Sequence, residues 1–204
     1  MRQRTSRALA AVVAACALAG CTTAAGGTVA GEATLQRTAA SSASGAVAAQ
    51  CRAGALTLAE GPGISPMTGE HGMLYEVVNH GPAACSLAGY PRLRLYAGTE
   101  ALPFRYASGG GPYVTARPPG TVTVKPGGAA WILVAKYRCD LGGLRDATTI
   151  SLTLPGTAGA ALSSPVPHDG AGASALTYCR GGAADPGQTV TVSPVEPAPD
   201  AVSR

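Results

Sequence analysis

The stretch MLYEVVNHGPAACSLAGYPRLRLY, residues 73–96, decides the fold. Its first six and its last five residues each divide into two alternating sets of side chains, and a period of two residues is typical of a β-strand. Turn-forming residues separate the halves, NHGP at 79–82 and GYP at 89–91. The pattern predicts a hairpin of two strands, with Cys85 between the bends and available to tie the hairpin to another strand.

Short alternating runs continue through the rest of the chain and are separated by segments rich in Gly and Pro. The runs expected to form further strands are 56–58, 104–106, 121–124, 129–138, 150–154 and 189–193. Most have one apolar face and one face rich in Thr, Ser and Arg, and no run of twelve residues carries a helical stripe. We therefore expect an all-β fold, an antiparallel immunoglobulin-like β-sandwich of about seven to eight strands.

The N-terminus has the pattern of an export signal. Three arginines within the first seven residues precede an apolar run over 8–19, which is too short to span a bilayer comfortably as a permanent helix. The run ends in LAGC at 18–21, which resembles the lipobox of bacterial lipoproteins, whose cysteine is acylated and becomes the new N-terminus. We expect residues 1–20 to be a lipoprotein signal peptide and Cys21 to be lipidated. An ordinary signal peptide cut elsewhere is the alternative.

Three segments are expected to follow the signal peptide. Residues 21–50 consist almost entirely of Ala, Gly, Thr and Ser and are expected to form a disordered tether. Residues 51–194 are expected to form the β-sandwich, and residues 195–204, rich in Pro with acidic residues, a disordered tail. The domain would then be extracytoplasmic, anchored to the outer face of the cell membrane through its lipid.

The charge balance argues against a nucleic-acid partner. Cleavage after residue 20 removes three arginines, which lowers the basic residues from 15 to 12 against 11 acidic ones. The formal charge then falls from +4 to +1. No basic patch remains to bind a nucleic acid.

Four cysteines remain once Cys16 has left with the signal and Cys21 has been lipidated: Cys51, Cys85, Cys139 and Cys179. An even number in an exported domain with few aromatic residues favours two structural disulfides. No close C-x-x-C pair is present, which argues against a zinc site or a thioredoxin-like motif. Of the three possible connectivities we expect the bridges 85–139 and 51–179. The first would pin the hairpin to the strand with the only tryptophan, and the second would close the two ends of the domain.

Catalytic patterns are weak. Ser108 precedes a run of three glycines but lacks the first glycine of a G-x-S-x-G elbow, and no Gly-Lys-Ser/Thr follows for a phosphate loop. The three histidines, His71, His80 and His168, lie in expected loops, and His71 beside Glu70 and His168 beside Asp169 offer neighbouring metal ligands. Solvated loop residues explain them better, and we expect no metal, no cofactor and no enzymatic activity. An envelope enzyme or metal-dependent protein built on these residues is the alternative.

One row of side chains offers a binding face. Arg92, Arg94 and Tyr96 share one side of an expected strand, and Arg and Tyr are favoured at interfaces. An ordinary soluble sheet surface is the other interpretation. Glu76, in the middle of a strand, is expected to face solvent or to pair with Arg92 or Arg94.

Several segments together resemble one family. They are NHG at 79–81, CSLAGYP at 85–91 and PGGAA at 126–130, combined with a cysteine before the first strand and one before the last. This arrangement is similar to the Domain of Unknown Function 4232 family of secreted and lipidated actinobacterial proteins, over residues 51–194. The resemblance implies a small extracytoplasmic β-sandwich and brings no established activity. We expect a tethered, non-enzymatic interaction module whose ligand is an envelope protein or a glycan.

Overall fold

The strand β8 (Ala129–Tyr137) is the centre of the larger of two packed sheets. The structure is a computed structural model, and it describes residues 48–64, 69–157, 159–167 and 176–204. The signal peptide, Cys21, most of the tether, and the pair His168 and Asp169 lie outside the described residues. Among the described residues, no helix has the length and apolar character needed to cross a bilayer.

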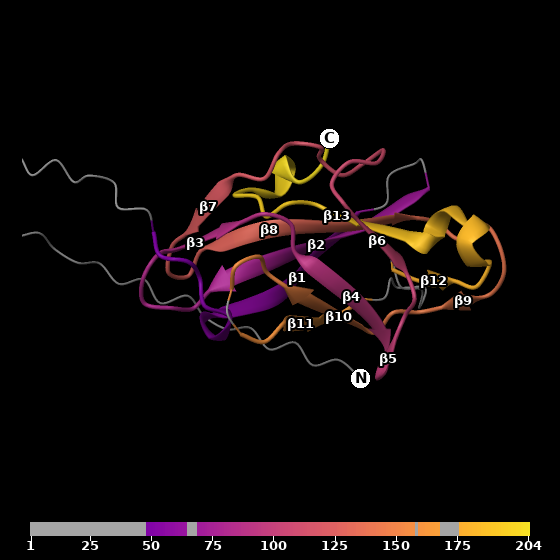
Figure 1. Cartoon of the computed structure of the whole chain (residues 1–204), viewed down its shortest axis with the longest axis horizontal. Coiled ribbons are helices and arrows are strands. Elements are labelled where there is room, and N and C mark those ends of the chain that lie inside the picture. The colour runs from indigo at the N-terminus through magenta and orange to yellow at the C-terminus, as the bar shows by residue number, and fades with distance from the viewer. Residues whose placement is uncertain (1–47, 65–68, 158, 168–175) are drawn as a thin grey trace, which may run out of the picture. The chain divides into compact units, whose positions relative to one another are not determined.

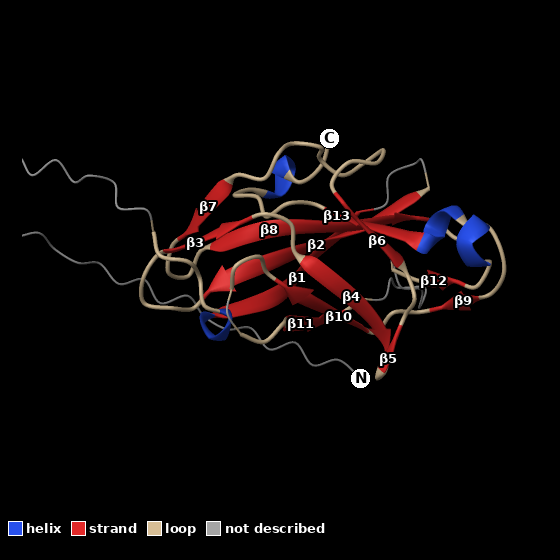
Figure 2. Cartoon of the chain, viewed as in Figure 1, coloured by secondary structure: helices blue, strands red, loops and turns tan. Residues whose placement is uncertain are grey.

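The described residues form thirteen strands and four single-turn 3-10 helices (Figure 2). The strands are β1 (Leu56–Ile64), β2 (Glu70–Asn79), β3 (Cys85–Ala88), β4 (Arg92–Ala97), β5 (Glu100–Ala101), β6 (Arg105–Ser108), β7 (Thr121–Val124), β8, β9 (Leu144–Arg145), β10 (Thr149–Thr153), β11 (Leu162–Pro165), β12 (Tyr178–Cys179) and β13 (Thr189–Val192). The helices are η1 (Ala53–Ala55), η2 (Gly182–Ala184), η3 (Pro186–Gln188) and η4 (Pro199–Ala201). The all-β prediction is confirmed.

Two main sheets make the sandwich (Figure 1). The larger has the strand order β1-β2-β8-β13-β6 and the smaller β11-β10-β4-β5. Two further ladders, β3 with β7 and β9 with β12, extend the domain. Among the described strands, β6 and β13 form the one parallel ladder, and an isolated bridge between Gln50 and Ser86 is parallel too. The strands outnumber the seven or eight expected because several are only two to four residues long and carry too little pattern to be recognised.

Residues 73–96 do not form the expected hairpin. β2 pairs with β1 and β8 in the larger sheet, whereas β4 pairs with β10 and β5 in the smaller one. Between them the chain forms β3, which pairs with β7. Both strands have the right period, but an alternating strand records only that one of its faces is apolar, not which strand lies beside it. The stretch therefore crosses from one sheet to the other.

The main core lies between the two sheets. Side chains with no more than about a tenth of their surface exposed come from both, among them Tyr75, Val77, Ile132, Val134, Val190, Leu93, Leu95, Ile150 and Leu152. Burial of each large apolar side chain contributes about 1.5–3 kcal/mol. This core fixes the smaller sheet over the larger one.

A second, smaller core covers the outer face of the larger sheet. It joins Leu74, Leu133 and Ala135 to Val114 and Val202. β8 is therefore buried on both faces, which explains its nearly continuous apolar run. Even Lys136 is buried there, with only 3% of its surface exposed.

The C-terminal segment completes this second core, so the expectation of a disordered tail over 195–204 is wrong. Glu196 and Trp131 exchange two backbone hydrogen bonds, of 2.8 and 2.9 Å. Further along, the Thr115 N–H donates to the Val202 carbonyl (2.9 Å), and the Val202 side chain is fully buried. Prolines suggested disorder, but Val195 is buried in the main core and Val202 in the second, and these apolar side chains hold the segment in place.

Candidate functional site

A groove of about 570 Å³ lies beside β4, and we call it the sheet-edge groove. β4 and the residue before it contribute one wall, β6 the opposite wall, and β10 with Ala161, the residue before β11, part of the floor. The lining residues are Pro91, Arg92, Leu93, Arg94, Tyr96, Tyr106, Ala107, Ser108, Ser151, Thr153, Ala161 and Val192. The groove thus takes residues from both sheets of the sandwich.

The groove exists because two sheets end side by side. β6 is the last strand of the larger sheet and, among the residues that the structure describes, pairs only with β13. β4 pairs with β5 only through residues 96–97, so its earlier residues have no strand on that side. One hydrogen bond joins the two edges, from the backbone N–H of Leu95 to the hydroxyl of Tyr106 (3.1 Å).

The expected binding row is part of this groove. Arg92 and Arg94 are exposed and Tyr96 is half-buried, all three on the outer face of β4. Neither guanidinium belongs to the described ion pairs, which are Arg138 with Asp140 and Arg145 with Glu100. A guanidinium without a carboxylate partner keeps its fork of N–H donors available to an external anion. The hypothesis of pairing with Glu76 is not supported, because Glu76 lies in the larger sheet beside Ala59 and Trp131.

Hydroxyl groups line the strand next to the arginines. The register places Arg92 opposite Thr153 and Arg94 opposite Ser151, and Ser163 of β11 is the next residue beyond Ser151. The alternation of Thr149, Ser151 and Thr153 is visible in the sequence, but its position beside the arginines is not, because the pairing of β4 with β10 joins segments more than fifty residues apart. Sequence reasoning missed these hydroxyls and the β6 wall for that reason.

Tyr106 is a neutral hydrogen-bonding group in the groove wall. Burial raises the pKa of its phenol, and the hydrogen bond from Leu95 and the charge of Arg94 offset only part of that rise. Its oxygen accepts from Leu95, which leaves its own proton to donate. The groove can therefore offer two cations and several neutral polar groups to a ligand.

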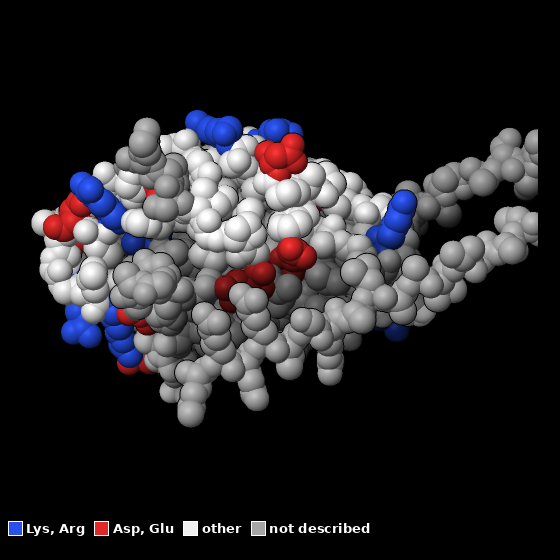
Figure 3. Space-filling model, turned by 180° about the vertical axis from the view of Figure 1, so that it is seen from behind, with Lys and Arg blue, Asp and Glu red and all other residues white. Residues whose placement is uncertain are grey.

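Charges elsewhere on the domain are mixed. On the face shown in Figure 3, basic and acidic side chains are interspersed, and most of the surface is uncharged. The two arginines of the groove provide a local attraction for an anion.

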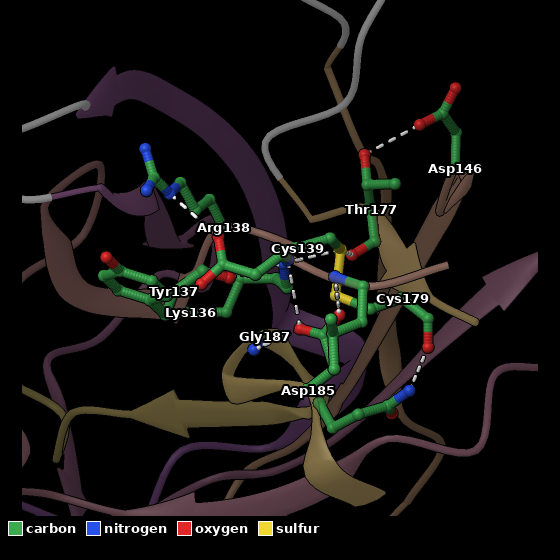
Figure 4. The surroundings of a disulfide bond; sticks show 12 residues. Lys136, Tyr137, Arg138, Cys139, Asp146, Thr177, Cys179, Asp185 and Gly187 are labelled. Atoms are coloured by element: carbon green, nitrogen blue, oxygen red, sulfur yellow. Dashed lines mark hydrogen bonds and ion pairs between the residues drawn. A yellow bond between two sulfur atoms is a disulfide. The ribbon is translucent and has the colours of Figure 1, made fainter. Parts of the chain in front are cut away.

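A second group of polar side chains surrounds a disulfide at one end of β8 (Figure 4). The ammonium group of Lys136 donates to the backbone carbonyl of Tyr137 (2.6 Å) and to Sγ of Cys139 (3.7 Å). Burial lowers the pKa of Lys136 to about 8, although the carboxylates of Asp185 and Glu70 partly oppose this. Burial conversely raises the pKa of Glu70, with Lys136 opposing the rise.

Asp185 fastens the loops around this disulfide. Its carboxylate accepts from the backbone N–H groups of Leu141 (2.7 Å) and Gly187 (2.9 Å), and more distantly from Asp140 (3.5 Å). Burial raises the pKa of Asp185, but these hydrogen bonds and the charge of Lys136 outweigh it, so the net shift is downward. The Asp185 carboxylate is therefore ionised, and its role is to hold the surrounding loops together through backbone hydrogen bonds.

Two disulfides are present, and the predicted pairing is wrong: the bridges are Cys51–Cys85 and Cys139–Cys179. The chain enters the domain alongside β3, where the Cys51 N–H donates to the Ser86 carbonyl (3.0 Å), and this brings Cys51 to Cys85. The β9–β12 ladder, which pairs Cys179 with Leu144, likewise returns Cys179 to the end of β8. The sequence identified the four cysteines correctly. Their pairing was predicted wrongly because it assumed a hairpin over residues 73–96, and that hairpin does not form.

Those residues weighed as metal ligands that the structure describes are not brought together. Glu70 and His71 are consecutive in β2, where neighbouring side chains point to opposite faces, and His80 shares a hydrogen bond with Thr57 (2.8 Å). Within the described ranges, the one cluster of three possible metal-ligating side chains is Cys139, Cys179 and Asp185, whose ligand atoms lie within 4.8 Å of one another. Its two sulfurs are joined in the disulfide and so are not thiolate ligands.

Comparison with known proteins places the chain in a family. No curated protein and no solved structure matches it. A family model described as a domain of unknown function, DUF4232, matches residues 51–196, and the chain therefore belongs to this family.

Proposed function

We propose that the protein is a membrane-tethered extracytoplasmic lipoprotein whose β-sandwich is a non-enzymatic binding module. In this proposal the sheet-edge groove holds an anionic group of an envelope ligand, a protein or a glycan. The observation that carries the proposal is the pair of exposed guanidiniums, Arg92 and Arg94, which have no carboxylate partner among the described residues.

The groups around the groove favour binding over covalent chemistry. Ser108 lines it at the end of β6, and among the described residues its hydroxyl donates to no histidine or carboxylate that could activate it. Tyr106 has a raised pKa and remains neutral. Hydroxyls, tyrosines and guanidiniums are groups that recognise a ligand by hydrogen bonds and charge.

The lipobox-like segment LAGC at 18–21 supports the proposed membrane anchor. Replacement Cys21→Ala should prevent incorporation of a palmitate analogue, and should leave the protein released or uncleaved. Metabolic labelling followed by membrane fractionation measures both effects. Equal labelling of the wild type and the variant would refute the lipid anchor.

Binding in the groove can be measured with citrate as the probe, on the soluble mature chain (residues 21–204 carrying Cys21→Ser). At citrate near ten times its Kd, the folded state should gain about 1.4 kcal/mol, a rise of about 3–6 °C in Tm. Uncharged trimethyl citrate at matched ionic strength should give no rise. The double variant Arg92→Gln/Arg94→Gln should lose the effect.

Arg52→Gln is the matched control, because Arg52 is an exposed arginine outside the groove. This variant should respond to citrate as the wild type does. An equal rise in Tm in the double variant would show that citrate acts elsewhere on the surface and would overturn the assignment of the groove.

A further inference from the structure

β4 presents an open backbone edge to the sheet-edge groove. The N–H of Leu95 donates to the Tyr106 hydroxyl and its carbonyl accepts from the N–H of Leu102 (2.8 Å), so both backbone groups of Leu95 point away from β10. Because this direction alternates along an antiparallel strand, the backbone groups of Leu93 point the same way. β5 pairs only with residues 96–97, so Leu93 has no strand partner on that side among the described residues.

The opposite wall of the groove is also a strand edge. Within the described ranges β6 pairs only with β13, and the Gly109 N–H that continues this ladder donates to the Val192 carbonyl (2.8 Å). By the same alternation, the backbone groups of Tyr106 and Ser108 point away from β13. The groove is thus bounded by two edges that both expose strand hydrogen-bonding groups, a surface to which an extended chain can add.

The side chains around the open edge select the composition of such a chain. Arg92 and Arg94 flank Leu93 on the outer face of β4, and directly opposite residues on an added strand would have Cβ atoms about 5 Å from theirs. The residue opposite Leu93 would instead turn toward the gap between the sheets, which Leu93, Ala107 and Val192 line. The matching pattern is acidic, apolar, acidic.

We propose that the groove accepts an extended segment of a partner protein with this acidic-apolar-acidic pattern, added as an antiparallel strand to the edge of β4. The proposal rests on the proposed function and specifies its ligand as a peptide. A glycan or a small anion would satisfy the arginines but not the backbone of Leu93. A second copy of the chain paired through the same edge would place arginines against arginines, which is unfavourable.

The test uses NMR of the soluble mature chain, titrated with the peptide Gly-Gly-Glu-Val-Glu-Gly-Gly. The Leu93 amide should shift and its hydrogen exchange should slow, because it gains a strand partner. A permuted peptide, Gly-Gly-Glu-Glu-Val-Gly-Gly, should bind about tenfold more weakly, since it cannot place both acids beside the arginines. Arg92→Gln/Arg94→Gln should lose about tenfold in affinity and Arg52→Gln should lose none.

Backbone methylation separates strand addition from simple charge attraction. In an antiparallel pair the valine opposite Leu93 exchanges both hydrogen bonds with it, whereas the flanking glutamates turn their N–H groups away from β4. N-methylation of the valine should therefore abolish binding, and N-methylation of a glutamate should leave the Leu93 shift intact.

The outcomes distinguish this inference from the proposed function. If citrate binds through the arginines but peptide order and methylation have no effect, the groove is an anion site and strand addition is refuted. If neither citrate nor peptide perturbs the groove, both proposals are refuted. A concentration-dependent dimer that masks the Leu93 amide without peptide would assign the edge to a second copy and would also overturn the inference.

Discussion

The ammonium group of Lys136 lies 3.7 Å from Sγ of Cys139, so a buried cation stands directly beside one of the two disulfides. Lys136 is the last residue of the buried run of β8, and the carboxylates of Asp185 and Glu70 attract its charge. The arrangement makes the stability of the domain depend on the protonation of one lysine.

We predict that stability rises with pH above neutrality. Burial lowers the pKa of Lys136 to about 8 in the folded state, whereas the unfolded chain keeps the ordinary value of 10.5. Between these values the unfolded state binds more protons, so the free energy of unfolding increases with pH, by about 2 kcal/mol from pH 7.5 to 9.5. Urea unfolding at several pH values measures this. Lys136→Met should remove the slope, and a Met variant with an unchanged slope would contradict the assignment.

We predict that Tyr75→Phe does not destabilise the protein and stabilises it by up to about 1 kcal/mol. The Tyr75 hydroxyl is the single buried side-chain polar atom of the described residues that lacks a hydrogen-bond partner, and burial raises its pKa. Its removal relieves a desolvation cost without breaking a bond. Tyr106→Phe is the control, because it breaks the bond to Leu95 and should cost about 1 kcal/mol. Equal losses in both variants would show that the Tyr75 hydroxyl has a partner.

We predict that the two disulfides stabilise the fold by similar amounts. Their sequence separations are 34 and 40 residues, and the chain-entropy model gives about 4 kcal/mol for each. Cys51→Ala/Cys85→Ala and Cys139→Ala/Cys179→Ala should each lower the free energy of unfolding by several kcal/mol, which denaturant titration measures. Proteolysis without reduction should release the linked peptides 51–85 and 139–179, and a peptide joining Cys85 to Cys139 would contradict the structure.

We predict that deletion of residues 197–204 is strongly destabilising. The deletion uncovers the second core around Leu133 and removes Val202, whose burial alone contributes about 1.5–3 kcal/mol. Arg204→Ala, which changes only an exposed side chain at the terminus, should have no measurable effect. A truncated domain with the wild-type Tm would show that the C-terminal segment does not pack on β8.

The sequence by itself determined the class of the fold and the cysteines that form disulfides. The period of two residues in runs such as 150–154 and the Gly and Pro between runs are local signals, because each strand must present one face to the core wherever it lies. The cysteines are likewise read from the sequence alone: their even number favoured disulfides, and their wide spacing argued against a zinc site built from close C-x-x-C pairs. The row of Arg92, Arg94 and Tyr96 was also visible as a single face.

Only the tertiary structure decided which strands are neighbours. The two halves of residues 73–96 lie in different sheets, and the disulfides follow those neighbours, so the expected hairpin led to the wrong pairing. The burial of Lys136 and of Val202 depends on a second apolar layer brought by the C-terminus. The groove depends on two strand edges, β4 and β6, that meet without pairing. Such contacts join residues far apart in the chain, and alternation within a strand carries no information about its partner.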